Sequence, residues 1–262
     1  MVTYNTQYRN REGVVEWEGA EVVTDSEFEH FLQTKVRERF DAEEAEEDFQ
    51  DVLHDVATSV WDSENLEQHL DNYELPTDDR DWKIGEAVAE CLLVDQESLT
   101  LPWNRSLDET NPRASLPGTD ILGFIHVAGQ TRFLFGEVKT SGAESSIPVS
   151  AMYSLRDQMQ DHLNEDSQSI LHAKILRYLR PRVKHDPDQW EMFKAALENH
   201  CSSEGSAIVV SGILLRDTAP TERDVESPAR SLAEDASQPT RVWVDAYYLP
   251  VPIEEWPEKM RE

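Results

Sequence analysis

The sequence predicts an α/β fold in which a mixed sheet is flanked by helices. Segments 119–127 and 131–140 are rich in Ile, Val, Phe, Leu and Thr and enclose a turn signal at 128–130, so they predict a β-hairpin. Apolar side chains fall on both faces of this hairpin, which is typical of a sheet covered on both sides. The apolar, β-branched segments 207–215 and 241–249 predict two later strands.

The amino-terminal region is expected to be acidic and mainly helical. A short strand over 13–23 precedes a helix start signal at Thr24 to Glu27. The helices that we expect before the hairpin cover 27–40, 43–61, 63–73 and 81–93. The second of them carries an apolar stripe that we assign to a core: Phe49, Val52, Leu53, Val56 and Val60. Because residues 76–79 read as a break, we expect one region over 1–75 and the α/β core over 76–262.

The segments after the hairpin predict a loop and three helices. The loop covers 141–148, and the helices cover 151–164, 168–179 and 187–200. Between the two later strands, residues 216–240 are polar and rich in Ser, Pro, Asp and Glu. We therefore expect a flexible excursion there.

Composition limits the class of protein. The chain has 262 residues, enough for one substantial core, and no apolar run long enough to span a bilayer. The amino terminus lacks a signal-peptide pattern, so we expect a cytoplasmic protein without a membrane anchor. Cys91 and Cys201 are expected to be reduced packing residues, with a disulfide between them as the alternative. The eight histidines show no ligand spacing, so zinc is not expected.

The hairpin places three charged side chains together. A two-residue turn at 128–129 pairs Asp120 with Glu137, and a turn at 129–130 pairs Asp120 with Lys139. Since side chains alternate with period two, either register puts all three on one face. A three-residue turn centred on Gly129 would instead put Asp120 on the other face. The apolar companions of the trio are Leu122, Phe124, Phe133 and Phe135, and the opposite face holds Ile121, Ile125, Leu134 and Val138.

Two carboxylates and an ammonium in this arrangement predict metal-dependent phosphodiester hydrolysis. Asp120 and Glu137 would hold Mg²⁺ or Mn²⁺, with the Val138 carbonyl as a further ligand. Such a cation makes water more acidic and neutralises charge on the phosphate, while Lys139 orients the water or offsets the developing charge. The simpler interpretation is an exposed ion pair at a strand end. Gly118 and Gly136 beside the site would let a phosphate backbone approach closely.

The motif resembles a known superfamily. Pro117-Gly118-Thr119-Asp120 followed by Gly136-Glu137-Val138-Lys139 is similar to the PD-(D/E)xK nucleases, which have the restriction-endonuclease-like fold. The resemblance implies that Asp120 and Glu137 bind metal, that Lys139 assists the water and that a glutamate on a preceding helix completes the site. Glu86 is our choice for that auxiliary ligand, and a solvated acidic face is the alternative. Polar residues on a following helix are also typical, and Gln158 and Gln160 are the candidates.

A closer resemblance covers roughly residues 80–250. The runs 118–124 and 135–141, preceded by Gly85-Glu86, are similar to the HamA nucleases of Hachiman antiphage defence. This resemblance implies an endo- or exodeoxyribonuclease that acts on DNA and is controlled by a HamB-like partner helicase. The preference for DNA over RNA comes from the resemblance alone.

Charge raises a separate question. The net charge is −29, more than half of it in the first 80 residues and concentrated in the run 41–48, so free binding to DNA is disfavoured. A basic stretch without acids follows the candidate site: Lys174, Arg177, Arg180, Arg182 and Lys184. We expect this stretch to contact the nucleic-acid backbone while the acidic part faces a partner or covers the basic surface. Adaptation to high internal salt explains the charge equally well, and a catalytically silent acidic regulatory subunit is the alternative function.

Overall fold

The computed structural model describes residues 2–40, 81–96, 99–102, 118–143 and 149–261. Within these ranges, seven strands form one mixed sheet in the order β1-β2-β7-β6-β5-β4-β3. Strands β2, β7, β6 and β5 run parallel to one another, while β1, β4 and β3 pair antiparallel with their neighbours. The strands are β1 (Tyr4–Glu12), β2 (Val15–Val22), β3 (Leu99–Thr100), β4 (Ile121–Val127), β5 (Gln130–Ser141), β6 (Ile208–Arg216) and β7 (Arg241–Tyr248).

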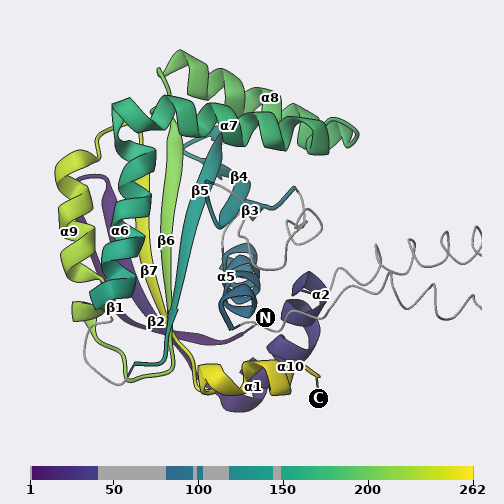
Figure 1. Ribbon diagram of the computed structural model, residues 1–262, viewed down its shortest axis with the longest axis vertical. Coiled ribbons are helices and arrows are strands. Elements are labelled where there is room, and N and C mark those ends of the chain that lie inside the picture. The colour runs from purple at the N-terminus through teal and green to yellow at the C-terminus, as the bar shows by residue number, and fades with distance from the viewer. Residues whose placement is uncertain (1, 41–80, 97–98, 103–117, 144–148, 262) are drawn as a thin grey trace, which may run out of the picture.

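Helices cover both faces of the sheet (Figure 1). One face is covered by α6 (Val149–Leu163), α7 (Glu165–Val183), α8 (Pro187–Ser202) and α9 (Glu226–Asp235). The other is covered by α1 (Asp25–Phe31), a π-helical turn (Leu32–Val36), α2 (Arg37–Phe40), α5 (Asp81–Gln96) and α10 (Trp256–Arg261). Short 3₁₀ turns occupy Glu222–Asp224 and Ile253–Glu255. The predicted α/β fold with a mixed sheet between helices is confirmed.

The hairpin register is the first of the two that we considered. Ala128 and Gly129 form a two-residue turn with φ of 52° and 75°, so Val127 pairs with Gln130 and Ile121 with Gly136. The predicted faces are confirmed. The face toward α5 holds Ile121, Ile125, Leu134 and Val138, and the face toward α6 holds Leu122, Phe124, Phe133 and Phe135.

Most of the other predicted elements inside the described ranges are present. The helix expected over 81–93 is α5, the three later helices are α6, α7 and α8, and the two later strands are β6 and β7. Thr24 caps α1, because its hydroxyl accepts a hydrogen bond from the Glu27 amide at 3.4 Å. The strand expected over 13–23 is β2, and the preceding β1 was not predicted. The helices over 43–61 and 63–73, the acidic run 41–48, the break at 76–79 and the boundary at 75/76 lie outside the described residues.

The flexible excursion predicted for 216–240 is wrong. Residues in this segment form the Glu222–Asp224 turn and α9, which packs on α6 and β2. Val225, Ala229 and Leu232 are fully buried, and Arg216 makes a buried ion pair with Asp224 at 3.2 Å. The apolar residues spaced four and three apart, together with this ion pair, order a segment whose polar composition suggested a loop.

Both cysteines are free thiols, and burial raises the pKa of Cys91 to about 12, so its thiol is not reactive near neutral pH. Among the described helices, none combines the length and the apolarity that a membrane span requires.

Candidate functional site

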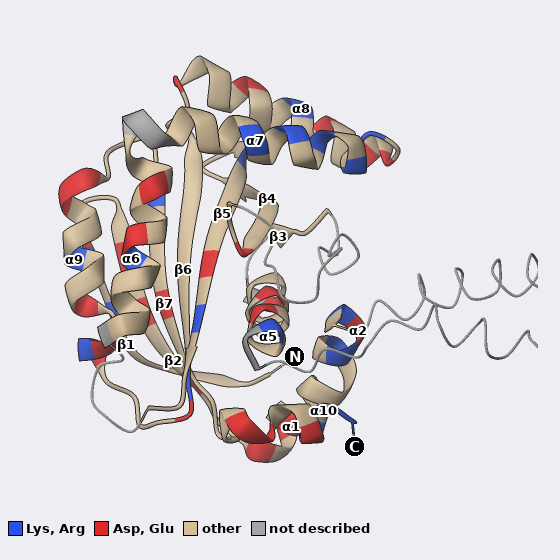
Figure 2. Cartoon of the chain, viewed as in Figure 1, with Lys and Arg blue, Asp and Glu red and all other residues tan. Residues whose placement is uncertain are grey.

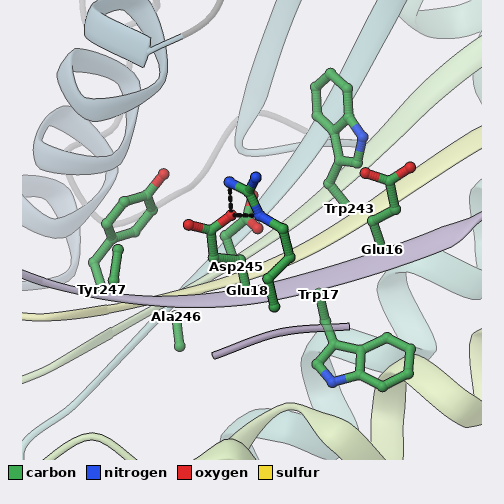
Figure 3. Close-up of a pocket in the computed structure, with 9 residues that line it drawn as sticks. Glu16, Trp17, Glu18, Trp243, Asp245, Ala246 and Tyr247 are labelled. Carbon is green, nitrogen blue, oxygen red and sulfur yellow. Dashed lines mark hydrogen bonds and ion pairs between the residues drawn. The ribbon is translucent and has the colours of Figure 1, made fainter. Parts of the chain in front are cut away.

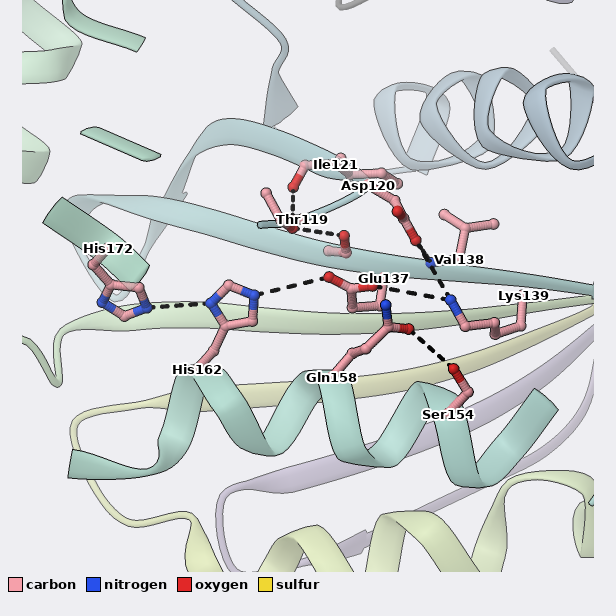
Figure 4. A network of polar contacts seen from close by, with 11 residues as sticks. Thr119, Asp120, Ile121, Glu137, Val138, Lys139, Ser154, Gln158, His162 and His172 are labelled. Atoms are coloured by element: carbon pink, nitrogen blue, oxygen red, sulfur yellow. Dashed lines mark hydrogen bonds and ion pairs between the residues drawn. The ribbon is translucent and has the colours of Figure 1, made fainter. Parts of the chain in front are cut away.

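Asp120, Glu137 and Lys139 lie together where β5 extends beyond the start of β4 (Figure 4). Lys139 Nζ is 3.7 Å from Asp120 Oδ2 and 4.0 Å from Glu137 Oε2. The three side chains are mostly buried, with exposed fractions of 14% for Asp120, 3% for Glu137 and 20% for Lys139. The ammonium therefore bridges two carboxylates in a partly dehydrated position, where Coulomb interactions are stronger than in bulk water.

The backbone around Asp120 fixes its side chain. The Asp120 amide donates to the Gly136 carbonyl at 2.9 Å, and Asp120 Oδ2 accepts a hydrogen bond from the Val138 amide at 2.9 Å. A strand residue directs its amide and its carbonyl to the same side, so the Val138 carbonyl also points away from β6 and toward the end of β4. Asp120 and the Val138 carbonyl thus share the open edge of β5.

Backbone conformation and close packing explain why glycine occupies two positions beside the site. Gly118 has a φ of +118°, and a Cβ there would lie 3.0 Å from Ile175 of α7. A Cβ on Gly136 would lie 2.9 Å from Ile121 on β4. The space beside each glycine is therefore filled by a protein side chain. The expectation that these glycines admit a phosphate backbone gives way to a packing explanation.

Glu137 faces α6. Its β6 neighbour is Gly212, where a Cβ would lie 2.4 Å from Met159 Sδ. The missing side chain lets α6 lie close to the sheet, and His162 on α6 then places Nε2 3.9 Å from Glu137 Oε1. Gln158 on the same helix points toward Glu137 and Lys139, and its Oε1 accepts a hydrogen bond from Ser154 Oγ at 3.4 Å (Figure 4). The site is thus formed by one strand edge and one helix.

A cluster of buried histidines that was not predicted from the sequence adjoins Glu137. His162 on α6 and His172 on α7 are 0% and 1% exposed, and His162 Nδ1 lies 3.2 Å from His172 Nε2. Both rings stack on Phe135, with ring centroids 5.0 and 4.4 Å from the Phe135 centroid. The ring centroids of His172 and His200 of α8 are 5.2 Å apart. A signal was present in the sequence, because His162 lies seven residues after Leu155 on the apolar stripe of its helix.

Burial keeps these histidines neutral. It lowers the pKa of His162 to about 4, with the Gly118 carbonyl acting in the opposite direction. It lowers the pKa of His172 to about 3, and the neighbouring His162 and His200 contribute to the same effect. Removing the charged form from water is the dominant cause in each case. At neutral pH both rings therefore carry one proton each.

Glu86 lies on α5, which covers the face of the sheet opposite Glu137 and Lys139. The adjacent Gly85 abuts β5, because a Cβ there would lie 2.3 Å from Thr140 Oγ1. This contact puts the Glu86 turn of α5 at the level of Lys139 along β5, and Glu86 is partly exposed. Glu90, one turn later, forms an ion pair with Arg39 of α2. Of the two acids on this helix face, Glu86 is nearer the β5 contact and stays our auxiliary candidate.

Gln160 is directed away from the site, since its amide donates to Asp235 of α9 at 2.8 Å. Of the two glutamines considered on this helix, only Gln158 faces the trio.

The donor set suits a hard divalent cation. Two carboxylates and a main-chain carbonyl are oxygen ligands, and Lys139 already places a positive charge between the two carboxylates. Within the described part of the chain, no three His, Cys, Asp or Glu side chains converge to hold a metal ion. Mg²⁺ commonly uses one or two carboxylates and completes its shell with water and phosphate oxygens. The residues present fit Mg²⁺ or Mn²⁺ with an incomplete protein shell.

The predicted basic stretch lies mainly on one helix, α7, and just beyond its end (Figure 2). Lys174, Arg177, Arg180 and Lys184 are exposed, and within the described ranges none of them forms an ion pair. Arg182 differs, because it stacks on the Tyr178 ring at 3.6 Å and donates to the Tyr178 carbonyl. The opposite face of α7, with His172 and Ile175, packs toward the site.

A separate cavity of about 230 Å³ lies against β1, β2 and β7 (Figure 3). Its lining includes Glu16, Glu18 and Asp245 with Arg9, and Arg9 is paired with Glu18. The excess of carboxylates disfavours an anionic ligand. None of the predicted site residues lines this cavity.

No protein-family profile matches the chain, and a comparison with curated proteins finds no significant match.

Proposed function

We propose that this protein is a Mg²⁺-dependent nuclease of the PD-(D/E)xK superfamily with a restriction-endonuclease-like core, and that it hydrolyses DNA phosphodiester bonds. One observation carries the proposal: the Lys139 ammonium lies within 4.0 Å of both the Asp120 and the Glu137 carboxylate, where β5 extends beyond the start of β4. The surrounding mixed sheet with helices on both faces is compatible with such a core.

Each residue has a distinct task in this mechanism. Asp120, Glu137 and the Val138 carbonyl would hold the cation, which would supply charge neutralisation and a more acidic water when bound. Lys139 orients the attacking water and stabilises charge that develops on the phosphate oxygens. The Val138 amide holds Asp120 in place. Glu86 on α5 would be an auxiliary ligand, reaching the cation from beside the end of β5.

The biological setting follows from the resemblance to the HamA nucleases. We place the protein as the effector of an antiphage defence complex whose activity a HamB-like helicase controls. The large negative charge supports this setting, since a chain of net charge −29 binds DNA weakly unless a partner or a local basic surface assists. The exposed cations of α7 are that surface.

The experiment compares cleavage of plasmid DNA by the wild type with that by Glu137→Gln and Lys139→Met, with Mg²⁺ and with or without the product of an adjacent helicase gene. We expect each variant to lose at least about 100-fold in rate. Lys194→Met is the matched control, because Lys194 is exposed on α8 and pairs only with Glu191 among the described residues. Equal cleavage by the wild type and both variants would exclude the trio from catalysis.

A second candidate is a silent regulatory subunit with a relic nuclease core. The ion pairs of Lys139 with both carboxylates favour it, because they satisfy the trio without a metal. Calorimetric titration with Mn²⁺ separates the two functions. A nuclease binds the ion and its Glu137→Gln variant does not, whereas in a relic site neither protein binds it.

A further inference from the structure

A chain of polar contacts runs from α7 through α6 to Glu137 on β5 (Figure 4). His172 Nε2 lies 3.2 Å from His162 Nδ1, and His162 Nε2 lies 3.9 Å from Glu137 Oε1. The two rings and Glu137 are almost completely buried, with exposed fractions of 1% or less for the histidines. Phe135 stacks on both rings and holds their planes nearly parallel to its own, at 5° and 17°.

The proton positions follow from the acceptors around each nitrogen. Glu137 Oε1 lies 3.9 Å from His162 Nε2, beyond hydrogen-bond distance, and Nε2 makes no hydrogen bond with the described residues. A proton on Nε2 places a positive dipole end beside the carboxylate, whereas a bare Nε2 would face it with a lone pair, so this nitrogen carries the proton. A neutral His162 then has a bare Nδ1, which accepts from His172 Nε2–H. His172 Nδ1 is left as a bare nitrogen without a hydrogen-bond partner among the described residues. The reverse direction would leave a buried N–H at His172 Nδ1 without an acceptor in the described part of the chain and a bare His162 Nε2 facing the Glu137 carboxylate, so the chain has one favoured direction.

We propose that His162 is a positioning residue for Glu137, held by His172 in the Nε2–H tautomer so that its N–H dipole points at the carboxylate. The inference rests on the proposed function, in which Glu137 is a metal ligand. His162 Nε2 faces one oxygen, Oε1, at 3.9 Å, and Lys139 Nζ faces the other, Oε2, at 4.0 Å. These two electrostatic contacts disfavour rotation of the Glu137 carboxylate away from Asp120. Partners of this kind orient a carboxylate before a ligand arrives.

The first test observes the protons directly. Long-range ¹H–¹⁵N spectra of the imidazole nitrogens distinguish Nε2–H from Nδ1–H tautomers, and His162→Gln and His172→Phe assign the signals. We expect both residues to be neutral Nε2–H tautomers at pH 7. An Nδ1–H tautomer at either residue, or a doubly protonated ring, reverses the chain and overturns the proposal. This readout does not depend on nuclease activity.

The second test measures Mn²⁺ binding by calorimetry. His162→Phe should weaken binding by about tenfold, and His162→Gln, whose amide can donate as Nε2–H does, should restore most of it. His172→Phe keeps the ring on Phe135 and should weaken binding less than His162→Phe. His200→Phe is the control at the far end of the cluster.

Thermal unfolding shows whether each variant is folded. Folded His162→Phe and His172→Phe proteins that bind Mn²⁺ as the wild type does would overturn the positioning role. A wild type that binds no Mn²⁺ contradicts the proposed metal function, and the tautomer spectra then still decide the direction of the histidine chain.

Discussion

The absence of a side chain at Gly212 determines how near α6 comes to Glu137. A Cβ at this position would lie 2.4 Å from Met159 Sδ and 3.3 Å from Leu155 Cδ2. We therefore expect Gly212→Ala to destabilise the protein by about 1–3 kcal/mol, because the added methyl group overpacks a closed interface. Urea unfolding measures the change.

A double-mutant cycle tests the cause. Met159→Ala alone should cost about 2–5 kcal/mol, since Met159 is fully buried. The double variant should be more stable than the sum of the two single effects by about 1 kcal/mol or more, because the smaller residue removes the clash. Strictly additive effects would show that Met159 does not limit the approach of α6.

His172 should make stability depend on pH. Its pKa is about 3 in the folded protein and about 6.5 when unfolded, so the unfolded chain takes up a proton first as the pH falls. The contribution of His172 to the free energy of unfolding is therefore fully present above pH 6.5 and falls by about 1.4 kcal/mol per pH unit below it. Between pH 7.5 and pH 5, His172→Phe should lose about 2 kcal/mol less than the wild type in urea unfolding. An equal loss in the two proteins would place His172 in contact with water.

The charged trio was predictable from the sequence, whereas the contact between His162 and His172 was not. Asp120 and Glu137 share a face because of one turn and the two-residue period of a strand, both of which are local. His162 and His172 meet because α6 and α7 pack against each other, which no local pattern specifies. Residues on one hairpin can thus be placed by counting, whereas residues on separate helices require the packed structure.

Helix α7 presents a face that suits a phosphate backbone. Arg177 and Arg180 are exposed there and form no ion pair with any residue that the structure describes. If they contact phosphates, each releases counterions, so log K falls with log salt at a slope of about −0.9 per contact on duplex DNA. Arg177→Gln/Arg180→Gln should reduce the steepness of that slope by about two, which fluorescence anisotropy at several salt concentrations measures.

The control for this measurement is Lys194→Gln on α8, which removes a cation that is already paired with Glu191. Its slope should match the wild type. A double variant with an unchanged slope would show that DNA, if bound, lies elsewhere on the protein.

At the same scale, α9 shows where composition misleads. Its segment was expected to be flexible because Ser, Pro, Asp and Glu dominate it. The order comes from residues far apart along the chain: Tyr8 of β1 contacts Tyr248 at 2.9 Å, and Tyr248 contacts Asp224 at 3.2 Å beside Arg216. Such long-range contacts stabilise a segment that has little propensity of its own.

For the whole molecule, the strands near the amino terminus change how the acidic region can be studied. Strands β1 and β2 belong to the same sheet as the site, with β2 paired to β7. Deleting residues 1–75 would remove two strands of that sheet along with the acidic run. Changing charge without changing chain length is the better experiment.

Replacing the six acids of the run 41–48 by their amides removes six negative charges. If this run competes with DNA for the α7 cations, the variant should bind duplex DNA more tightly than the wild type at 0.05 M salt. The gain should vanish near 0.5 M salt, because the Debye length falls to a few ångströms there. It should also disappear when Arg177→Gln/Arg180→Gln is added. Equal affinities at every salt concentration would exclude competition, and greater stability of the variant at low salt would then favour adaptation of the chain to high internal salt.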